Sequence, residues 1–207
     1  MAEHIHLDIF FDFMCPFVYR AAVWLDRVRE GMGYGLSICW RYFSLEQVNS
    51  QQGLEWKLWE QPDDFPSRGL WAFGAAEAAR CQGEDAFNRF HSALLHARHV
   101  QGKDIAERSV LAEVASGMGL DVPRFQEDLA RRELLSRLAE DHETAVEEYG
   151  VFGTPTIVFP GGEAVFIKLS DIPPAGDALA LFHELLHLST ARTYVREIKR
   201  PQRPKKG

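Results

Sequence analysis

The sequence predicts an α/β protein in which a block of helices interrupts a small sheet. Residues 4–13 alternate between apolar and polar side chains, which is the pattern of a strand with one buried face. Helical spacing of apolar residues recurs between positions 64 and 149, and strand-like residues return only after Gly150. A chain of 207 residues is long enough for one domain that carries an insertion of this size.

The first strand is predicted to run directly into a helix. Pro16 follows the strand closely, and proline is accepted in the first turn of a helix, where no hydrogen bond needs its N–H. Apolar residues then recur at helical spacing as far as Val28, and Gly31 or Gly33 is expected to end the helix. A second strand is predicted over residues 36–43.

The middle of the chain is predicted to be helical, with glycines at the breaks. The expected helices are 70–81, 87–98, 109–118 and one or two within 123–149. The last elements, two strands of a hairpin and a helix, are expected over 156–159, 164–169 and 175–188. Without the middle helices the order is βαβ followed by ββα, which is that of a thioredoxin-like core. The predicted division is a thioredoxin-like core over 1–63 and 149–190, a helical insertion over 64–148, and a basic C-terminal tail over 191–207.

Composition and charge narrow the class of protein. The apolar fraction of 46% is ample for a packed core, and no run reaches the roughly 18 to 20 apolar residues that a membrane span requires. The N-terminus lacks the basic start and apolar stretch of a secretory signal, so a cytoplasmic protein with no membrane partner is expected. The net charge is −7, whereas the tail after position 190 holds seven Lys or Arg residues against one Glu. We interpret that tail as a solvated or self-docking terminus, with no nucleic-acid partner.

The three cysteines are too few for a disulfide scaffold, and their odd number leaves at least one thiol unpaired in the monomer. Cys15 falls at the junction of the first strand and the first helix, where the free N–H groups and positive end of the helix stabilise a thiolate. Cys39 is expected in the core of the second strand, and Cys81 is expected to be a partly buried bystander. Cys15 is therefore the predicted nucleophile.

A second motif, Gly153-Thr154-Pro155-Thr156, opens the predicted hairpin. Proline at a strand entry lacks an N–H, and X–Pro is the bond type at which a cis peptide is not prohibitive. In thioredoxin-like folds such a proline faces the reactive thiol and leaves a backbone edge free for an extended substrate or a thiol cofactor. Thr-Pro-Thr alone is a weak signal, and its combination with Cys15-Pro16 is much stronger.

The two motifs resemble those of the DsbA-like thioredoxin superfamily, in particular its cytoplasmic FrnE-type branch. The resemblance implies a thioredoxin fold with a helical insertion, thiol–disulfide oxidoreductase chemistry, and Cys15 as the nucleophile. The predicted substrate-binding residues are Pro16, Phe17, Val18, Thr154 and Pro155. The matching segments are Phe11-Asp12-Phe13-Met14-Cys15-Pro16-Phe17-Val18-Tyr19, Ser44-Leu45-Glu46-Gln47-Val48-Asn49 and Tyr149-Gly150-Val151-Phe152-Gly153-Thr154-Pro155-Thr156.

The sequence departs from the dithiol members of that family at Val18, where a two-thiol site would carry its second cysteine. Disulfide exchange needs one thiolate that attacks and a second thiol that resolves the mixed disulfide. We therefore predict a monothiol oxidoreductase without a bound cofactor. Glutathione, another low-molecular-weight thiol or a protein thiol would supply the second sulfur, and the partner would be a small thiol or a protein thiol or disulfide.

Two other functions stay open on the sequence. The related 2-hydroxychromene-2-carboxylate isomerases and kappa-class glutathione transferases carry serine near this position and use bound glutathione. A glutathione-dependent isomerase or transferase is therefore the first alternative, and a non-catalytic thioredoxin-like binding module is the second. His183-Glu184-Leu185-Leu186-His187 matches the zinc motif H-E-x-x-H, but it lies in an amphipathic terminal helix without a third ligand downstream, so no metal site is predicted.

Overall fold

The computed structural model of this chain describes residues 4–53 and 55–200, and it contains a four-stranded mixed sheet. In the sheet β1 lies parallel to β2 and antiparallel to β3, and β3 pairs antiparallel with β4. The predicted α/β fold class, with the order βαβ followed by ββα, is confirmed. The strands, in the spatial order β2-β1-β3-β4, are β1 (Ile5–Phe11), β2 (Leu36–Tyr42), β3 (Thr156–Val158) and β4 (Ala164–Phe166).

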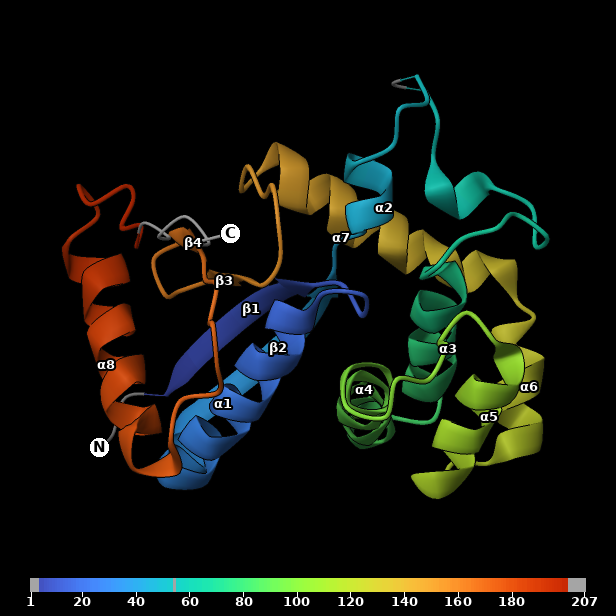
Figure 1. The fold of residues 1–207 in the computed structure, drawn as a ribbon, viewed down its shortest axis with the longest axis horizontal. Helices are drawn as coiled ribbons and strands as arrows, with labels where there is room; N and C mark the ends of the chain where they lie inside the picture. The colour runs from blue at the N-terminus through green and yellow to red at the C-terminus, as the bar shows by residue number, and fades with distance from the viewer. Residues whose placement is uncertain (1–3, 54, 201–207) are drawn as a thin grey trace, which may run out of the picture.

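Two long helices, α1 (Pro16–Met32) and α8 (Ala175–Ala191), pack against each other beside the sheet (Figure 1). The indole N–H of Trp24 donates a hydrogen bond to the carbonyl of Ala178 at 3.0 Å, and the Trp24 ring lies 6.3 Å from that of Phe182. Gly33 ends α1 with a positive φ of 58°, which glycine adopts because it has no Cβ. The last turn of α1 is therefore fixed next to the start of β2.

The helical block follows β2 and a short helix, α2 (Leu45–Val48). Figure 1 shows α3 to α6 grouped at one end of the molecule, while α7 runs back from this group toward the sheet. α7 packs against β2, so the block is joined to the sheet at its C-terminal end. The helices of the block are α3 (Leu70–Arg80), α4 (Glu84–His99), α5 (Arg108–Gly117), α6 (Val122–Leu129) and α7 (Ser136–Glu147).

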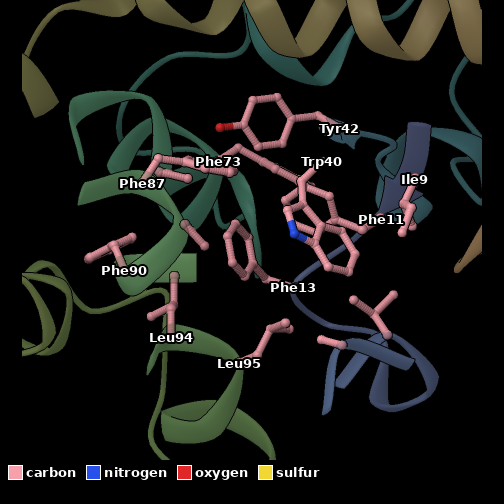
Figure 2. Packing of buried hydrophobic residues seen from close by; sticks show 14 of the residues in the cluster. Ile9, Phe11, Phe13, Trp40, Tyr42, Phe73, Phe87, Phe90, Leu94 and Leu95 are labelled. Carbon is pink, nitrogen blue, oxygen red and sulfur yellow. The ribbon is translucent and has the colours of Figure 1, made fainter. Parts of the chain in front are cut away.

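One aromatic core joins the sheet to the helical block (Figure 2). The ring of Phe11 lies 5.0 Å from that of Phe13 and 5.6 Å from that of Trp40. His91 of α4 enters this group, with its ring 4.3 Å from that of Trp40 and 4.6 Å from that of Phe11. Because these side chains are buried together, the sheet and the block share one hydrophobic core.

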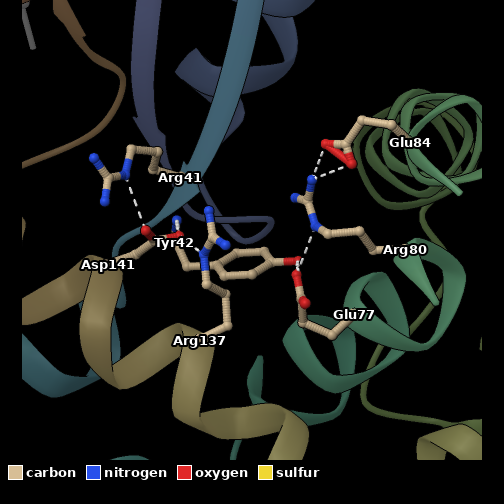
Figure 3. A network of polar contacts seen from close by, with 7 residues as sticks. All are labelled: Arg41, Tyr42, Glu77, Arg80, Glu84, Arg137 and Asp141. Atoms are coloured by element: carbon tan, nitrogen blue, oxygen red, sulfur yellow. Dashed lines mark hydrogen bonds and ion pairs between the residues drawn. The ribbon is translucent and has the colours of Figure 1, made fainter.

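A buried polar network adds a second connection between β2 and the block (Figure 3). The Tyr42 hydroxyl donates to Glu77 of α3 at 2.6 Å, and Arg80 Nε donates to the same carboxylate at 2.8 Å. Asp141 of α7 accepts hydrogen bonds from Arg41 Nε at 2.9 Å and from the Tyr42 backbone N–H at 3.1 Å. Arg41 and Tyr42, at the end of β2, thus connect the strand to both α3 and α7.

The element boundaries differ from the predictions at a few places. Phe13 belongs to a turn rather than to the first strand, because the Cys15 N–H bonds back to the Asp12 carbonyl at 3.0 Å. The hairpin strands are shorter than predicted. β3 ends at Val158, before the loop that the bond from the Phe159 N–H to the Glu163 carbonyl closes at 2.9 Å, and β4 ends at Phe166. α8 extends as far as Ala191, three residues beyond the predicted end. The division into a core over 1–63 and 149–190, an insertion over 64–148 and a tail over 191–207 remains a prediction.

The described part of the tail, residues 192–200, forms no helix or strand and is exposed. Arg196 lies 3.8 Å from the Glu163 carboxylate. The remaining tail residues of the prediction, including Arg203, Lys205 and Lys206, fall outside the described residues. Within the described ranges, no helix combines the length and apolar character needed to cross a membrane.

Candidate functional site

Cys15 caps the N-terminus of α1. Its backbone is extended, with φ −85° and ψ 115°, and Pro16 occupies the first turn of the helix. The first turn carries no acidic side chain, so no carboxylate of that turn neutralises the positive end of this 17-residue helix. The free N–H groups at a helix start are donors that stabilise an anionic sulfur.

The entry of β3 lies directly beside this thiol. The Cys15 Sγ donates a hydrogen bond to the carbonyl oxygen of Thr154 at 3.2 Å, across 139 positions of sequence. The Thr154–Pro155 peptide bond is cis, and both residues are buried. The structure therefore brings together the two motifs that the sequence singled out, and their contact with a substrate stays a prediction.

The three residues after Cys15 differ in their surroundings. Pro16 is exposed, Phe17 is half-buried, and Val18 is fully buried in the core. The Val18 N–H donates to the Cys15 carbonyl at 3.1 Å. The position at which a dithiol site would carry its second sulfur is thus filled by a packed aliphatic side chain.

Asp12 holds the loop that carries Cys15, a role that the sequence analysis missed. Its carboxylate accepts hydrogen bonds from the Met14 N–H at 2.8 Å and from the Leu45 N–H at 2.7 Å. Burial of the carboxyl raises the pKa of Asp12 to about 6, although both backbone hydrogen bonds act in the opposite direction. An Asp that precedes a helix cap by a few residues and bonds to the N–H two positions on is a known turn signal, and it could have been used here.

His99 of α4 holds the same loop from the side of the helical block. Its Nε2 lies 2.8 Å from the carbonyl oxygen of Phe13, and the Tyr19 ring stacks on its imidazole at 6.0 Å. Burial lowers the pKa of His99, so the neutral ring is favoured in this contact. The insertion therefore contributes directly to the position of the Cys15 loop.

The other two cysteines have no comparable setting. Cys39 is half-buried in β2, and burial together with the nearby Asp8 raises its pKa. Cys81 follows α3, and burial together with Asp128 raises its pKa as well. Both thiols are therefore less ionised at neutral pH than free cysteine.

The described residues contain no group of three or more His, Cys, Asp or Glu side chains arranged to hold a metal ion. His183, Glu184 and His187 are exposed on α8.

A strand–helix junction with Cys-Pro, facing a cis proline at the entry of an antiparallel strand, defines the class of thioredoxin-like proteins. A family model described as the DSBA-like thioredoxin domain matches residues 6–173, and the chain belongs to this family.

Two sequence relatives match most of this chain. Uncharacterized protein Rv2286c of Mycobacterium tuberculosis is 28% identical over 198 residues, which covers 96% of this chain and 83% of that protein. Na(+)/H(+) antiporter NhaA 1 of Mycolicibacterium vanbaalenii is 29% identical over 152 residues. That match covers 72% of this chain and 21% of the antiporter.

Several solved structures share this fold. A putative protein disulfide isomerase from Nitrosomonas europaea superposes with a TM-score of 0.63 at 18% identity, over 89% of this chain and 98% of that one. A 2-hydroxychromene-2-carboxylate isomerase superposes with a TM-score of 0.62 at 20% identity, over 93% of this chain and 100% of that one. The cytosolic disulfide reductase DsbM from Pseudomonas aeruginosa, solved with GSH, superposes with a TM-score of 0.60 at 18% identity, over 88% of this chain and 100% of that one.

Proposed function

We propose that this chain is a thiol–disulfide oxidoreductase that acts through Cys15 as its single nucleophile and uses an external thiol to resolve the mixed disulfide. The observation that carries the proposal is the 3.2 Å contact between Cys15 Sγ and the carbonyl of Thr154, at the start of a helix and beside a cis proline. This arrangement supports the proposal, because a sulfur beside a free backbone edge could react with an extended substrate that pairs with that edge.

The reaction begins when the Cys15 thiolate attacks one sulfur of a substrate disulfide. The substrate S–S bond breaks, an S–S bond forms between Cys15 and that sulfur, and the other sulfur leaves as a thiolate that takes a proton from water. An external thiolate then attacks the Cys15 sulfur and releases the substrate as a second thiol. Attack by another external thiol restores Cys15, so one substrate disulfide is reduced while two external thiols become one disulfide.

The proposal needs an external thiol because the residues around Cys15 offer no second thiol. Val18 fills the usual position, Cys39 lies in β2, and Cys81 follows α3. A disulfide reductase of the same fold has been solved with GSH, which supports glutathione as the external thiol. That relative is cytosolic, which supports the same compartment for this chain. The FrnE-type branch is proposed on the sequence motifs around Cys15 and Thr154.

The proposal is tested by following the three cysteines of the intact protein at pH 7 by mass spectrometry. We expect iodoacetamide to label Cys15 faster than Cys39 and Cys81, which serve as internal controls because burial raises the pKa of both. We also expect glutathione disulfide to form an adduct on Cys15 that reduced glutathione removes. Labelling of Cys15 no faster than Cys39, with no adduct, would contradict the proposal and favour the binding module.

A glutathione-dependent isomerase or transferase is the second candidate. The superposition on 2-hydroxychromene-2-carboxylate isomerase, which covers 100% of that chain, favours it. In such an enzyme the reactive sulfur belongs to glutathione, so saturable glutathione binding and turnover would survive the replacement Cys15→Ser. Activity assays of that variant separate the candidates, because the oxidoreductase loses disulfide reduction with Cys15, whereas the isomerase or transferase keeps its glutathione-dependent turnover.

A further inference from the structure

Two cations and an aromatic ring lie together next to the Cys15 loop. Lys168 Nζ lies 4.4 Å from the centroid of the Phe17 ring, and the guanidinium carbon of Arg20 lies 5.4 Å from it. Arg20 also donates from Nη1 to the carbonyl of Leu169 at 3.0 Å, which fixes one edge of its guanidinium. We refer to Phe17, Arg20 and Lys168 as the Phe17 cluster.

A closed series of contacts sets the position of the Phe17 cluster relative to the thiol. Cys15 Sγ bonds to the Thr154 carbonyl at 3.2 Å, and the next carbonyl, that of Pro155, accepts the Ile167 N–H at 3.1 Å. Lys168 directly follows Ile167 and returns to the ring of Phe17, two residues after Cys15. These contacts connect the cluster and the sulfur through α1, the entry of β3 and the residues after β4, and we refer to these connected segments as the rim.

The charge of this rim is opposite to that of the whole chain, whose net charge is −7. The ion pairs among the described residues include neither Arg20 nor Lys168. Asp171, the nearest acid along the chain, accepts the Ile172 N–H, and Asp12 is buried and bound to backbone N–H groups. The positive end of α1 adds to the same local field.

We propose that the Phe17 cluster binds a carboxylate of the small thiol or disulfide that reacts with Cys15, so that the preferred cosubstrate is anionic. The inference rests on the proposed function and narrows its cosubstrate class. Lysine supplies a point charge with rotatable donors, and arginine supplies a planar fork that matches carboxylate geometry. Because one cation belongs to the helix that Cys15 caps and the other to the segment after β4, a carboxylate held by both would keep its sulfur near Cys15.

The test compares three small disulfides of different charge in their reaction with Cys15. Glutathione disulfide is anionic, 2-hydroxyethyl disulfide is neutral and cystamine is cationic, and each gives a Cys15 adduct that mass spectrometry times. In Lys168→Met we expect the glutathione disulfide rate to fall about fivefold, the change expected for one ion pair at 4 Å in water. The neutral rate should stay constant and the cystamine rate should rise. Raising the salt concentration should reduce these differences.

Lys57→Met is the matched control, because Lys57 also lies over an aromatic ring, 5.6 Å from the centroid of Trp59, but outside this rim. It should leave all three rates unchanged. Equal loss of all three rates in Lys168→Met would overturn the subsite, since Lys168 would then act on the Cys15 sulfur itself. Unchanged rates for all three disulfides would overturn it as well. Failure of the wild-type protein to react even with the neutral disulfide would instead refute the proposed function, and the subsite with it.

Discussion

The carboxylate of Asp12 accepts the backbone N–H of Leu45 at 2.7 Å, and its other oxygen accepts the N–H of Met14 at 2.8 Å. A single buried side chain thus joins the loop that carries Cys15 to the first residue of α2. His99 holds the same Cys15 loop through the carbonyl of Phe13, from the side of the helical block. The position of the nucleophile therefore depends on contacts from two directions.

Asp12→Ala is expected to destabilise the protein. The substitution leaves the N–H groups of Met14 and Leu45 without their acceptor, and each buried unpaired donor costs about 1 to 3 kcal/mol. The expected loss is about 2 to 6 kcal/mol in the free energy of unfolding, measured by urea denaturation. Cys15 alkylation should change in the same variant. A loss below about 0.5 kcal/mol would show that the loop does not depend on this carboxylate.

Asp12→Asn is expected to change how stability depends on pH. Because burial raises the folded-state pKa of Asp12 from 3.8 to about 6, the carboxyl contributes stability that is complete below pH 3.8 and is lost as the pH rises through 6. The free energy of unfolding of the wild type should fall relative to that of Asp12→Asn by about 1.4 kcal/mol per pH unit across this window. Urea unfolding at pH 4, 5, 6 and 7 measures the difference, and a constant difference would exclude the titration of Asp12.

His91→Leu is expected to remove part of the acid sensitivity of the fold. His91 is buried among aromatic rings, its Nε2 has no hydrogen-bond partner among the described residues, and burial lowers its pKa to about 3. A histidine with a lowered folded-state pKa contributes stability that is present above pH 6.5 and is lost as the pH falls toward 3. This loss should amount to about 1.4 kcal/mol per pH unit in the wild type and be absent from the variant.

The control for His91→Leu is His183→Leu, because His183 is exposed on α8. Urea unfolding between pH 4 and 7 should show the wild-type slope in His183→Leu and a shallower slope in His91→Leu. Identical slopes in the two variants would mean that His91 does not titrate in the unfolding transition.

Thr154→Val is expected to stabilise the protein. The Thr154 hydroxyl is buried and has no hydrogen-bond partner in the described part of the chain, whereas its carbonyl holds Cys15 and is kept in the variant. Removing a buried unpaired hydroxyl should raise the free energy of unfolding by about 1 kcal/mol. The alkylation rate of Cys15 should not change. A loss of stability would indicate that the hydroxyl is paired, for example with an ordered water molecule.

The order of helices and strands could be predicted because apolar periodicity is a local property of the chain. The proximity of Cys15 and Thr154 could be predicted because each lies in a short motif, and in thioredoxin-like folds the proline of the second motif faces the reactive thiol of the first. The hairpin strands were predicted too long, since the bond from the Phe159 N–H to the Glu163 carbonyl depends on the turn rather than on side-chain pattern.

The remaining site residues could not be predicted in the same way. Lys168 meets Phe17, and His99 meets Phe13, only because the fold brings distant segments together. Nothing in the local pattern distinguishes Lys168 from the other basic residues of the chain. The alternating pattern of residues 4–13 puts Asp12 on the polar face of a strand, and its bond to the Met14 N–H follows from a turn that this pattern hides.

Val18→Cys tests whether the missing second thiol is what makes an external thiol necessary. Val18 is fully buried, and its N–H bonds to the carbonyl of Cys15 at 3.1 Å within the first turn of α1. Cysteine behaves as a small hydrophobic residue, so the substitution should cost less than about 1.5 kcal/mol in the free energy of unfolding. The introduced thiol would then lie in the same helical turn as the nucleophile, at the spacing of a two-thiol redox site.

In Val18→Cys we expect the glutathione adduct on Cys15 to be short-lived. The introduced thiolate attacks the Cys15 sulfur, glutathione leaves as a thiolate, and an intramolecular disulfide remains, which mass spectrometry detects as the loss of two hydrogens. In the wild type and in Val18→Ser, the adduct should persist until reduced glutathione is added. An adduct equally long-lived in Val18→Cys would mean that packing at position 18 keeps the second sulfur away from Cys15, so that the helix geometry as well as the residue type prevents resolution within this site.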